Sequence, residues 1–307
     1  LFGSIKKGKY IQHNFIPSIL DSKNQILDGA QRHPYYYNPW KDSYRYSLMS
    51  IKKMPKAKVL KGNVFCLATD GCHDGFFHFL TRLTAKISIL KESNIDINMF
   101  SYFIVNGPEK KYKRECLKQA GIDLNKVIYA DENEAYQAEL LFFVPRIRFH
   151  SLGHDFLRDI FLENKTIPAG KNIFISRKDA KHRYLLQENE LLQKLSKYNF
   201  SEVALSELNI KEQADLFNKS KNIIGCHGAG LANIIFCQNN SNLVEIYDDE
   251  FVNINYWFYA NIFNLNYFPL IGKTKQGKLN KNRKGFDDID LKKEHIEKLN
   301  QLMSKLQ

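Results

Sequence analysis

Two arginines and a glycine-rich stretch are the residues of this sequence whose types and spacing point most directly to chemistry. The stretch, residues 222–233, reads N-I-I-G-C-H-G-A-G-L-A-N, and Arg177 and Arg183 precede it. Guanidinium groups stay charged and bind phosphate oxygens in pairs. Glycines let a backbone approach a ligand closely, and the free N–H groups at a helix start favour an anion. Together these residues predict a site for a phosphate-bearing ligand.

The order of the glycines limits which phosphate ligand to expect. Gly225, Gly228 and Gly230 form G-x-x-G-x-G on a late strand, whereas dinucleotide-binding enzymes carry G-x-G-x-x-G on an early one. The sequence also lacks the P-loop pattern G-x-x-x-x-G-K-[ST], the hydrolase pattern G-x-S-x-G and the zinc pattern H-E-x-x-H. NAD binding, P-loop ATP chemistry, serine hydrolysis and zinc proteolysis are therefore disfavoured.

The elements that must position these residues are predicted by alternating apolar and amphipathic runs. We expect strands at residues 172–176, 200–205, 222–225, 243–247 and 267–270. We expect helices at residues 188–197, 210–220, 231–237, 252–263 and 291–306. This alternation predicts a parallel sheet covered on both faces, with ligands at the carboxyl ends of its strands. The arginine loop, the glycine loop and Glu245 would meet at that edge. Glu245 would be an acceptor for ribose hydroxyls or, alternatively, an ordinary charge at a strand end. Asn209 and Glu212 have the spacing of a helix capping box.

The first half of the sequence indicates a second, less regular α/β unit. We expect strands at residues 59–60, 64–68, 99–105, 126–129 and 140–144, with a turn at 61–63. We expect helices from an Asp74 N-cap to Lys91 and at residues 109–120 and 156–161. Residues 1–50 predict an irregular arm packed on this unit, with short strands as an option at its end. A Pro- and Gly-containing break divides the chain into domains of residues 1–165 and 166–307, and the last helix is a candidate to pack back on the first domain.

Composition narrows the partners and the compartment. The 307 residues contain 45 Lys and Arg against 33 Asp and Glu, a net charge of +12, which favours anionic partners. No zinc finger or other nucleic-acid motif is present, so nucleic acid is the less favoured anion. Five cysteines without a C-x-x-C pair indicate a reduced, cytoplasmic setting rather than a disulfide framework. The spacing of Cys66, Cys72, His73 and His78 matches no common zinc pattern, so no metal site is expected.

Several motifs in the second half resemble glycosyltransferase family 61, known from capsule and polysaccharide biosynthesis. I-S-R-K-D-A-K-H-R, N-E-L, L-N-I-K-E-Q-A-D-L-F, the glycine stretch and L-V-E-I follow the family's order over most of residues 172–247. Upstream, G-F-F-H-F-L at residues 75–80 is similar to the family's N-Y-x-H-W-L, and L-R at 157–158 to its L-R. Gly75 replaces the usual Asn, and Arg82 stands where many members have an acidic residue.

The resemblance implies an α/β fold of the GT-B type, with two Rossmann-like domains facing a cleft and a nucleotide sugar in the C-terminal one. It implies inversion at the anomeric carbon and no obligatory metal or other cofactor. Arg177 and Arg183 would neutralise the diphosphate of the donor. The remaining residues implied for this site are the loop backbone at His227, Gly228, Ala229, Gly230 and Leu231, together with Glu212, Asn233 and Glu245, which would shape or contact the nucleotide. Glu212 has the alternative role of holding the loop.

An inverting displacement requires a general base near the acceptor hydroxyl, normally a carboxylate or histidine of the N-terminal domain. The candidates are Asp70, His73, Asp74 and His78, of which Asp74 and His78 are preferred as catalytic residues. The departure at Arg82 removes one acid of the family.

The sequence therefore predicts an inverting, metal-independent glycosyltransferase. It would move a sugar from a nucleotide-diphosphate donor, expected to be UDP-linked, to a glycan or lipid-linked acceptor in surface polysaccharide synthesis. The basic surface suggests peripheral contact with the anionic inner face of the cytoplasmic membrane. Two alternatives stay open: a non-enzymatic protein that binds a polyanion, either nucleic acid or acidic glycan, and a nucleotide-sugar epimerase on the same scaffold.

Overall fold

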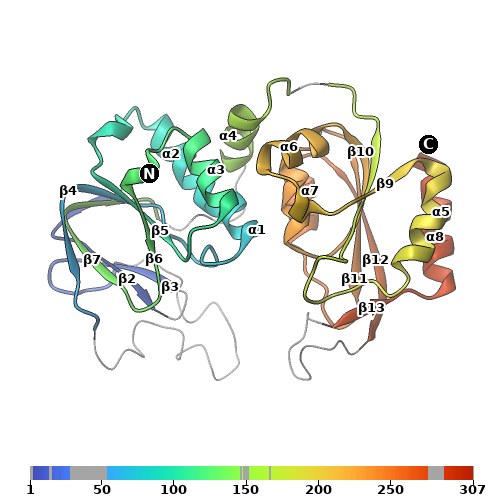
Figure 1. The fold of residues 1–307 in the computed structure, drawn as a ribbon, viewed down its shortest axis with the longest axis horizontal. Helices are drawn as coiled ribbons and strands as arrows, with labels where there is room; N and C mark the ends of the chain where they lie inside the picture. Colours follow the sequence, from blue (N-terminus) through green and yellow to red (C-terminus); the bar gives the residue numbers. More distant parts are fainter. Residues whose placement is uncertain are drawn as a thin grey trace. The chain divides into compact units, whose positions relative to one another are not determined.

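The computed structural model describes residues 3–13, 16–27, 54–145, 147, 152–165, 167–275 and 287–306. The chain forms two compact units, Leu1–Ile160 and Phe161–Gln307, called here the N-terminal and C-terminal units (Figure 1). Each unit has a sheet and helices of its own, so the predicted α/β class is confirmed. Residues 28–50 of the predicted arm and most of the basic stretch between the last two strands lie outside the described residues.

The N-terminal unit combines a parallel core with an antiparallel margin. Its strands are β1 (Gly3–Lys6), β2 (Lys9–His13), β3 (Ile16–Leu20), β4 (Lys58–Cys66), β5 (Tyr102–Asn106), β6 (Val127–Ala130) and β7 (Ala135–Phe143). Its helices are α1 (Phe76–His78), α2 (Thr84–Glu92), α3 (Lys111–Gln119) and α4 (Leu152–Phe161), the last crossing the boundary between the units. The sheet runs β3-β2-β7-β4-β5-β6, with β1 also paired to β7. The strands β4 to β7 are mutually parallel, and β1 and β2 run antiparallel to β7.

Two strand predictions for this unit were wrong. Within the expected irregular arm, residues 3–6, 9–13 and 16–20 form the strands β1–β3, in which Tyr10, Ile11 and Ile19 are buried. The expected turn at 61–63 is a bulge inside the single strand β4, where the register with β7 shifts between Leu60 and Asn63. Gly62 supplies the left-handed backbone at φ +81° that the bulge requires.

The predicted N-cap at Asp74 was also wrong. The helix begins one residue later, after Gly75, and no side chain caps it. Residues Phe79–Leu83 then continue as a π-helical stretch into α2. The Asp74 carboxylate cannot cap because it is bonded to the Nζ of Lys110 and the Nδ1 of His73.

The C-terminal unit is the more regular of the two. Its strands are β8 (Lys171–Ile175), β9 (Phe200–Val203), β10 (Ser220–Cys226), β11 (Asn242–Asp248), β12 (Asn266–Lys275) and β13 (Asp288–Asp290). Its helices are α5 (Glu188–Leu195), α6 (Ile210–Asn218), α7 (Asn255–Ile262) and α8 (Lys293–Leu306). The sheet runs β13-β12-β11-β10-β8-β9, and β8 to β12 are parallel, which confirms the five predicted strands. The antiparallel β13 was not predicted.

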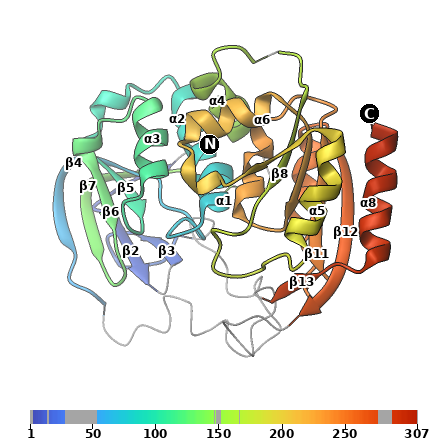
Figure 2. The same ribbon diagram turned by 45° about the vertical axis from the view of Figure 1, so that its right-hand side comes forward.

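Helices cover both faces of this sheet, α5 and α8 on one and α6 and α7 on the other (Figures 1 and 2). On the first face, Ile296, Leu299 and Met303 of α8 pack with Phe174 and Ile224 in the core of the C-terminal unit. The last helix thus buries its apolar stripe within its own unit.

Four asparagines form a ladder across the amino ends of these strands. Asn222 donates to Asn172 Oδ1 over 2.8 Å, Asn242 to Asn222 Oδ1 over 2.7 Å, and Asn266 to Asn242 Oδ1 over 3.0 Å. The four residues are in register on β8, β10, β11 and β12. An amide both donates and accepts, so each inner asparagine ties together its two neighbours.

We expect Asn222→Ala to destabilise the protein by about 1–3 kcal/mol, because it leaves an acceptor on Asn172 and a donor on Asn242 unpartnered in a mostly buried position. Urea denaturation measures the change in unfolding free energy. Asn261→Ala is the matched control, since its exposed amide bonds only Trp257 O within its own helix. Equal stability of the two variants would contradict a structural role for the ladder.

Candidate active site

The strand order of the C-terminal unit reverses between β8 and β10, since the chain runs from β8 outward to β9 and then returns to β10 on the other side. Open parallel sheets bind ligands where the strand order reverses, outside the carboxyl ends of the strands. The segment that begins at Ser176 follows β8, and the loop that begins at His227 follows β10. The arginines and the glycines of the sequence motifs therefore meet at this reversal.

Arg177 and Arg183 are gathered there. A Cβ atom added to Gly228 would lie 2.5 Å from Arg177 Nη1, so the guanidinium lies directly over this glycine. Burial, and then the charge of Arg177, lower the pKa of Arg183 to about 10, so the two cations are close enough to repel. No described carboxylate lies at ion-pair distance from either guanidinium, and both buried Nε atoms lack a partner among the described residues. Paired arginines without a protein counter-ion form a site for an anion.

The backbone around the arginines is held by contacts that the sequence motifs did not predict. Glu188, buried at the start of α5, accepts from Ser176 Oγ over 2.5 Å and from the Arg177 amide over 3.2 Å. Arg183 has a left-handed backbone at φ +58°. Its neighbour Tyr184 donates its amide to Asp288 Oδ1 and accepts from the Ile289 amide. The only sequence feature that could have indicated this role is that Glu188 is an acidic residue at the start of the helix that follows the arginine loop.

The glycine loop leads into a 3₁₀-helix, Ala229–Phe236, where the sequence predicted an α-helix. Asn233 is fully buried, and its amide donates to Gly230 O over 3.0 Å and to Gln213 Oε1 over 2.7 Å. From α7, Tyr256 donates to Gly228 O over 2.6 Å. Asn233 and Tyr256 thus hold the glycine loop through hydrogen bonds to its carbonyl groups. Neither Gln213 nor Tyr256 was among the predicted site residues.

Glu212 forms the predicted capping box of α6, which is confirmed. Its carboxylate accepts from the Asn209 amide over 2.7 Å, and its amide donates to Asn209 Oδ1 over 3.0 Å. The side chain is exposed and engaged at the helix start, one residue before the Gln213 that holds Asn233. The described contacts of Glu212 are thus those of a helix cap, and it is the neighbouring Gln213 that contacts Asn233 after the glycine loop.

Glu245 lies beneath His227. The carboxylate is fully buried, and its Oε1 is 2.5 Å from His227 Nδ1 while its Oε2 accepts from the Tyr267 hydroxyl over 2.8 Å. The imidazole stacks on Tyr247 with ring centres 5.3 Å apart, and Phe251 and Tyr256 meet it edge-on. Both oxygens of Glu245 are thus engaged by protein groups.

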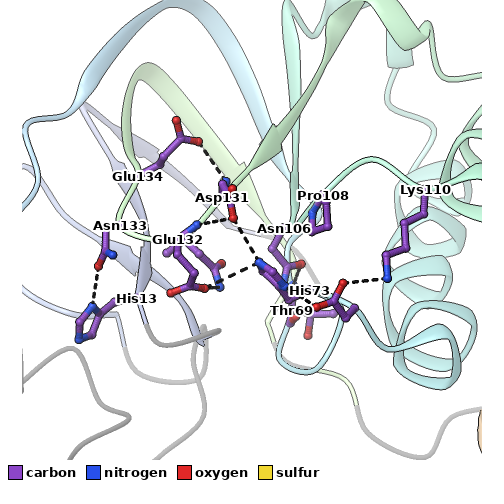
Figure 3. A network of polar contacts seen from close by, with 12 residues as sticks. His13, Thr69, His73, Asn106, Pro108, Lys110, Asp131, Glu132, Asn133 and Glu134 are labelled. Carbon is purple, nitrogen blue, oxygen red and sulfur yellow. Dashed lines mark hydrogen bonds and ion pairs between the residues drawn. The ribbon is translucent and has the colours of Figure 1, made fainter. Parts of the chain in front are cut away.

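In the N-terminal unit, the loop after β4 carries the candidate bases. Asp70 is buried and bonded to Arg82 Nη1 over 2.6 Å, so the arginine that departs from the family pattern is the counter-ion of this carboxylate. His73 Nδ1 lies 3.2 Å from Asp74, and its Nε2 lies 3.4 Å from Asp131 in the loop after β6 (Figure 3). The Lys110 ammonium is 2.8 Å from Asp74, and that hydrogen bond is the main cause that lowers the pKa of Asp74.

His78 lies in α1 against the same loop. A Cβ added to Gly71 or Gly75 would lie 2.3 or 2.9 Å from His78 Cδ2, so the imidazole fills the space that these two glycines leave. Gly71 also has a left-handed backbone, φ +77°. The residue as a whole is partly exposed and follows the carboxyl end of β4. The order of the parallel strands of this unit, β7-β4-β5-β6, reverses between β4 and β7.

A comparison with protein families finds a match that includes residues of both units. The model described as "Glycosyltransferase 61" matches residues 76–244, more than half of the chain and parts of both units. The chain belongs to glycosyltransferase family 61. A search of curated proteins finds no match.

The family 61 match spans most of the residues described above. It begins at the helix that carries His78 and includes Arg177, Arg183 and the loop at His227. It ends one residue before Glu245. The resemblance deduced from the sequence is confirmed, and membership supports glycosyltransferase activity, with a nucleotide-sugar donor and a glycan acceptor in general terms.

Proposed function

We propose that this member of family 61 is an inverting glycosyltransferase of the GT-B type that uses a nucleotide-diphosphate sugar, with UDP as the expected nucleotide. The observation that carries the proposal is the pair Arg177 and Arg183 at the strand reversal, neither of which has a described carboxylate partner. Arg177 lies over Gly228, and Arg183 is close enough to Arg177 to be affected by its charge. A diphosphate supplies the missing negative charge. Its charge also opposes the effects of burial and of the neighbouring Arg177, which together lower the pKa of Arg183.

The same cations favour departure of the nucleoside diphosphate. As the bond between the anomeric carbon and the β-phosphate oxygen breaks, the electron pair stays on that oxygen, and fixed positive groups stabilise it most at that moment. The amides of the loop at Gly228–Leu231 add preorganised donors. We propose that these groups serve where other transferases use a metal ion.

His78 is the proposed general base. Asp70 is neutralised by Arg82, and Asp74 is a weaker base because the hydrogen bond from Lys110 lowers its pKa. His73 has both ring nitrogens near carboxylates. His78 combines partial exposure, a place at the strand reversal of the N-terminal unit and a position that matches the family's N-Y-x-H-W-L motif.

The acceptor we propose is a glycan or a lipid-linked saccharide in surface polysaccharide synthesis, reached from the cytoplasmic side. The net charge of +12 supports contact with an anionic membrane surface. Among the helices of the described residues, none combines the length and the apolar character needed to cross a membrane.

A nucleoside-diphosphate binding screen tests the proposal, followed by product analysis with a panel of nucleotide sugars. We expect UDP to raise the melting temperature, and Arg177→Ala to weaken UDP binding at least about tenfold, since charged hydrogen bonds contribute about 1.5–3 kcal/mol each. Unchanged affinity in Arg177→Ala would remove the phosphate assignment. Steeply salt-dependent polyanion binding without saturable UDP binding would favour the non-enzymatic alternative. A product with an altered sugar still on the nucleotide would favour an epimerase.

A further inference from the structure

The buried pair of His227 and Glu245 has a feature that backbone binding of phosphate does not require. An ionised carboxylate only accepts hydrogen bonds, and Glu245 already accepts from Tyr267 through Oε2. The 2.5 Å contact at Oε1 therefore places a proton on His227 Nδ1. With Nδ1 committed, Nε2 is the ring nitrogen left to meet a ligand, and among the described residues no group is bonded to it.

The ring is also held in a fixed plane. Tyr247 stacks on it with an interplanar angle of 20°, and Phe251 and Tyr256 close the other sides. Tyr256 donates to Gly228 O and is acted on electrostatically by both Arg177 and Arg183. His227 thus shares its neighbour Tyr256 with the arginine pair and the glycine loop.

We propose that His227 takes up a proton on Nε2 when the nucleoside diphosphate binds and, through this N–H group, donates a hydrogen bond to a phosphate oxygen. Glu245 is the positioning residue that holds the opposite proton on Nδ1. This inference rests on the proposed function. The proton comes from solvent, and the imidazolium is then held between two anions, Glu245 and the diphosphate. When the bond to the sugar breaks, the electron pair stays on the phosphate, where the Nε2–H hydrogen bond adds to the two guanidinium groups.

The charges around the ring explain why the second proton arrives with the ligand. Two guanidinium groups already make the free site positive, which opposes a further cation, and the incoming diphosphate reverses that balance. Burial raises the pKa of Tyr256 and of Tyr267, so these hydroxyls stay protonated and do not compete. Titratable and charged groups from several elements and loops face the ring or the arginine pair. They are Glu245, Tyr247 and Asp248 of β11, Tyr267 of β12, Tyr256 of α7, Cys226 of β10, Glu188 of α5, and Arg177, His182 and Arg183 after β8.

Isothermal titration of the whole chain with UDP at pH 8, in buffers of different ionisation enthalpy, counts the protons exchanged on binding. The UDP phosphate is fully ionised at this pH and brings no proton of its own, so we expect uptake approaching one proton. Glu245→Gln and His227→Gln should lose the uptake, with affinity about tenfold weaker. Tyr267→Phe is the matched control, because it removes the bond to Oε2 but leaves the one to His227, and it should keep the uptake.

The outcomes separate this inference from the proposed function. Absence of UDP binding to the wild-type chain would overturn the proposed function itself. UDP binding without proton uptake, or uptake that is unchanged in Glu245→Gln, would overturn the role of the His227–Glu245 pair and leave the nucleotide site standing. A merely structural Glu245 would alter stability without altering the proton count.

Discussion

Arg183→Gly is expected to abolish most nucleotide binding while leaving the fold as stable as before. Arg183 has a left-handed backbone that costs a non-glycine residue about 1–2 kcal/mol and that glycine adopts freely. The substitution also removes the repulsion from Arg177. The greater freedom of glycine in the unfolded chain and the loss of the buried arginine stem offset these gains, so we expect an unfolding free energy within about 1 kcal/mol of the wild type.

The loss of binding should be much larger. Removing charge-assisted bonds to a phosphate costs about 1.5–3 kcal/mol each, so the affinity for UDP should fall about 10- to 100-fold. Calorimetric titration measures the affinity, and thermal denaturation with and without UDP separates it from stability. Lys178→Ala is the control, since Lys178 lies on the same loop but is exposed and paired with Glu202. A UDP-dependent rise in melting temperature that survives in Arg183→Gly would contradict the assignment of this arginine.

His78→Gln is expected to lower kcat by about 10²–10⁴, the usual contribution of a general base, without changing the affinity for UDP. The proposed base belongs to the N-terminal unit and the proposed diphosphate site to the C-terminal unit, so the two effects are separable. Glutamine keeps much of the volume that Gly71 and Gly75 leave for the ring. Steady-state transfer to acceptor measures kcat, and titration with UDP measures donor-site binding.

Asp74→Asn is the matched comparison, from the same loop. Its carboxylate is more than half exposed, at 61%, and is engaged by Lys110, so kcat should change far less than in His78→Gln. The reverse result, a large loss in Asp74→Asn and a small one in His78→Gln, would assign the base to Asp74.

Regular elements with strong periodicity could be predicted from the sequence. The strands β8 to β12 alternate with amphipathic helices, and the capping box at Asn209 and Glu212 was deduced from spacing alone. The elements of the N-terminal unit were harder to predict, because glycine occurs in turns, in β-bulges and at helix starts alike. Gly62 indicated a turn but forms a bulge, and Gly75 was overlooked as the residue before α1 because Asp74 is the better capping type.

Site residues could be predicted from the sequence where the residue type alone suggests a role. They were missed where the role depends on a contact between residues far apart in the sequence. The convergence of Arg177 with the glycine loop follows from parallel-strand logic. The pairing of Glu245 with His227 depends on two strands lying side by side in one register, which spacing along the chain does not state. The contacts of Glu188 with the arginine loop and of Gln213 with Asn233 are tertiary in the same way.

The asparagine ladder fastens the strands at one edge of the C-terminal sheet, and the ionisable groups of the proposed site gather at the other. Amides neither gain nor lose protons over the range in which proteins stay folded, so the alignment of β8, β10, β11 and β12 is fixed equally in acid and in base. A slip of one residue would turn Glu245 to the opposite face of the sheet and away from His227. The ladder thus keeps the strand register independent of pH. We therefore expect a pH profile of nucleotide binding to reflect protonation of site groups such as His227 and Glu245, and not a change in strand register.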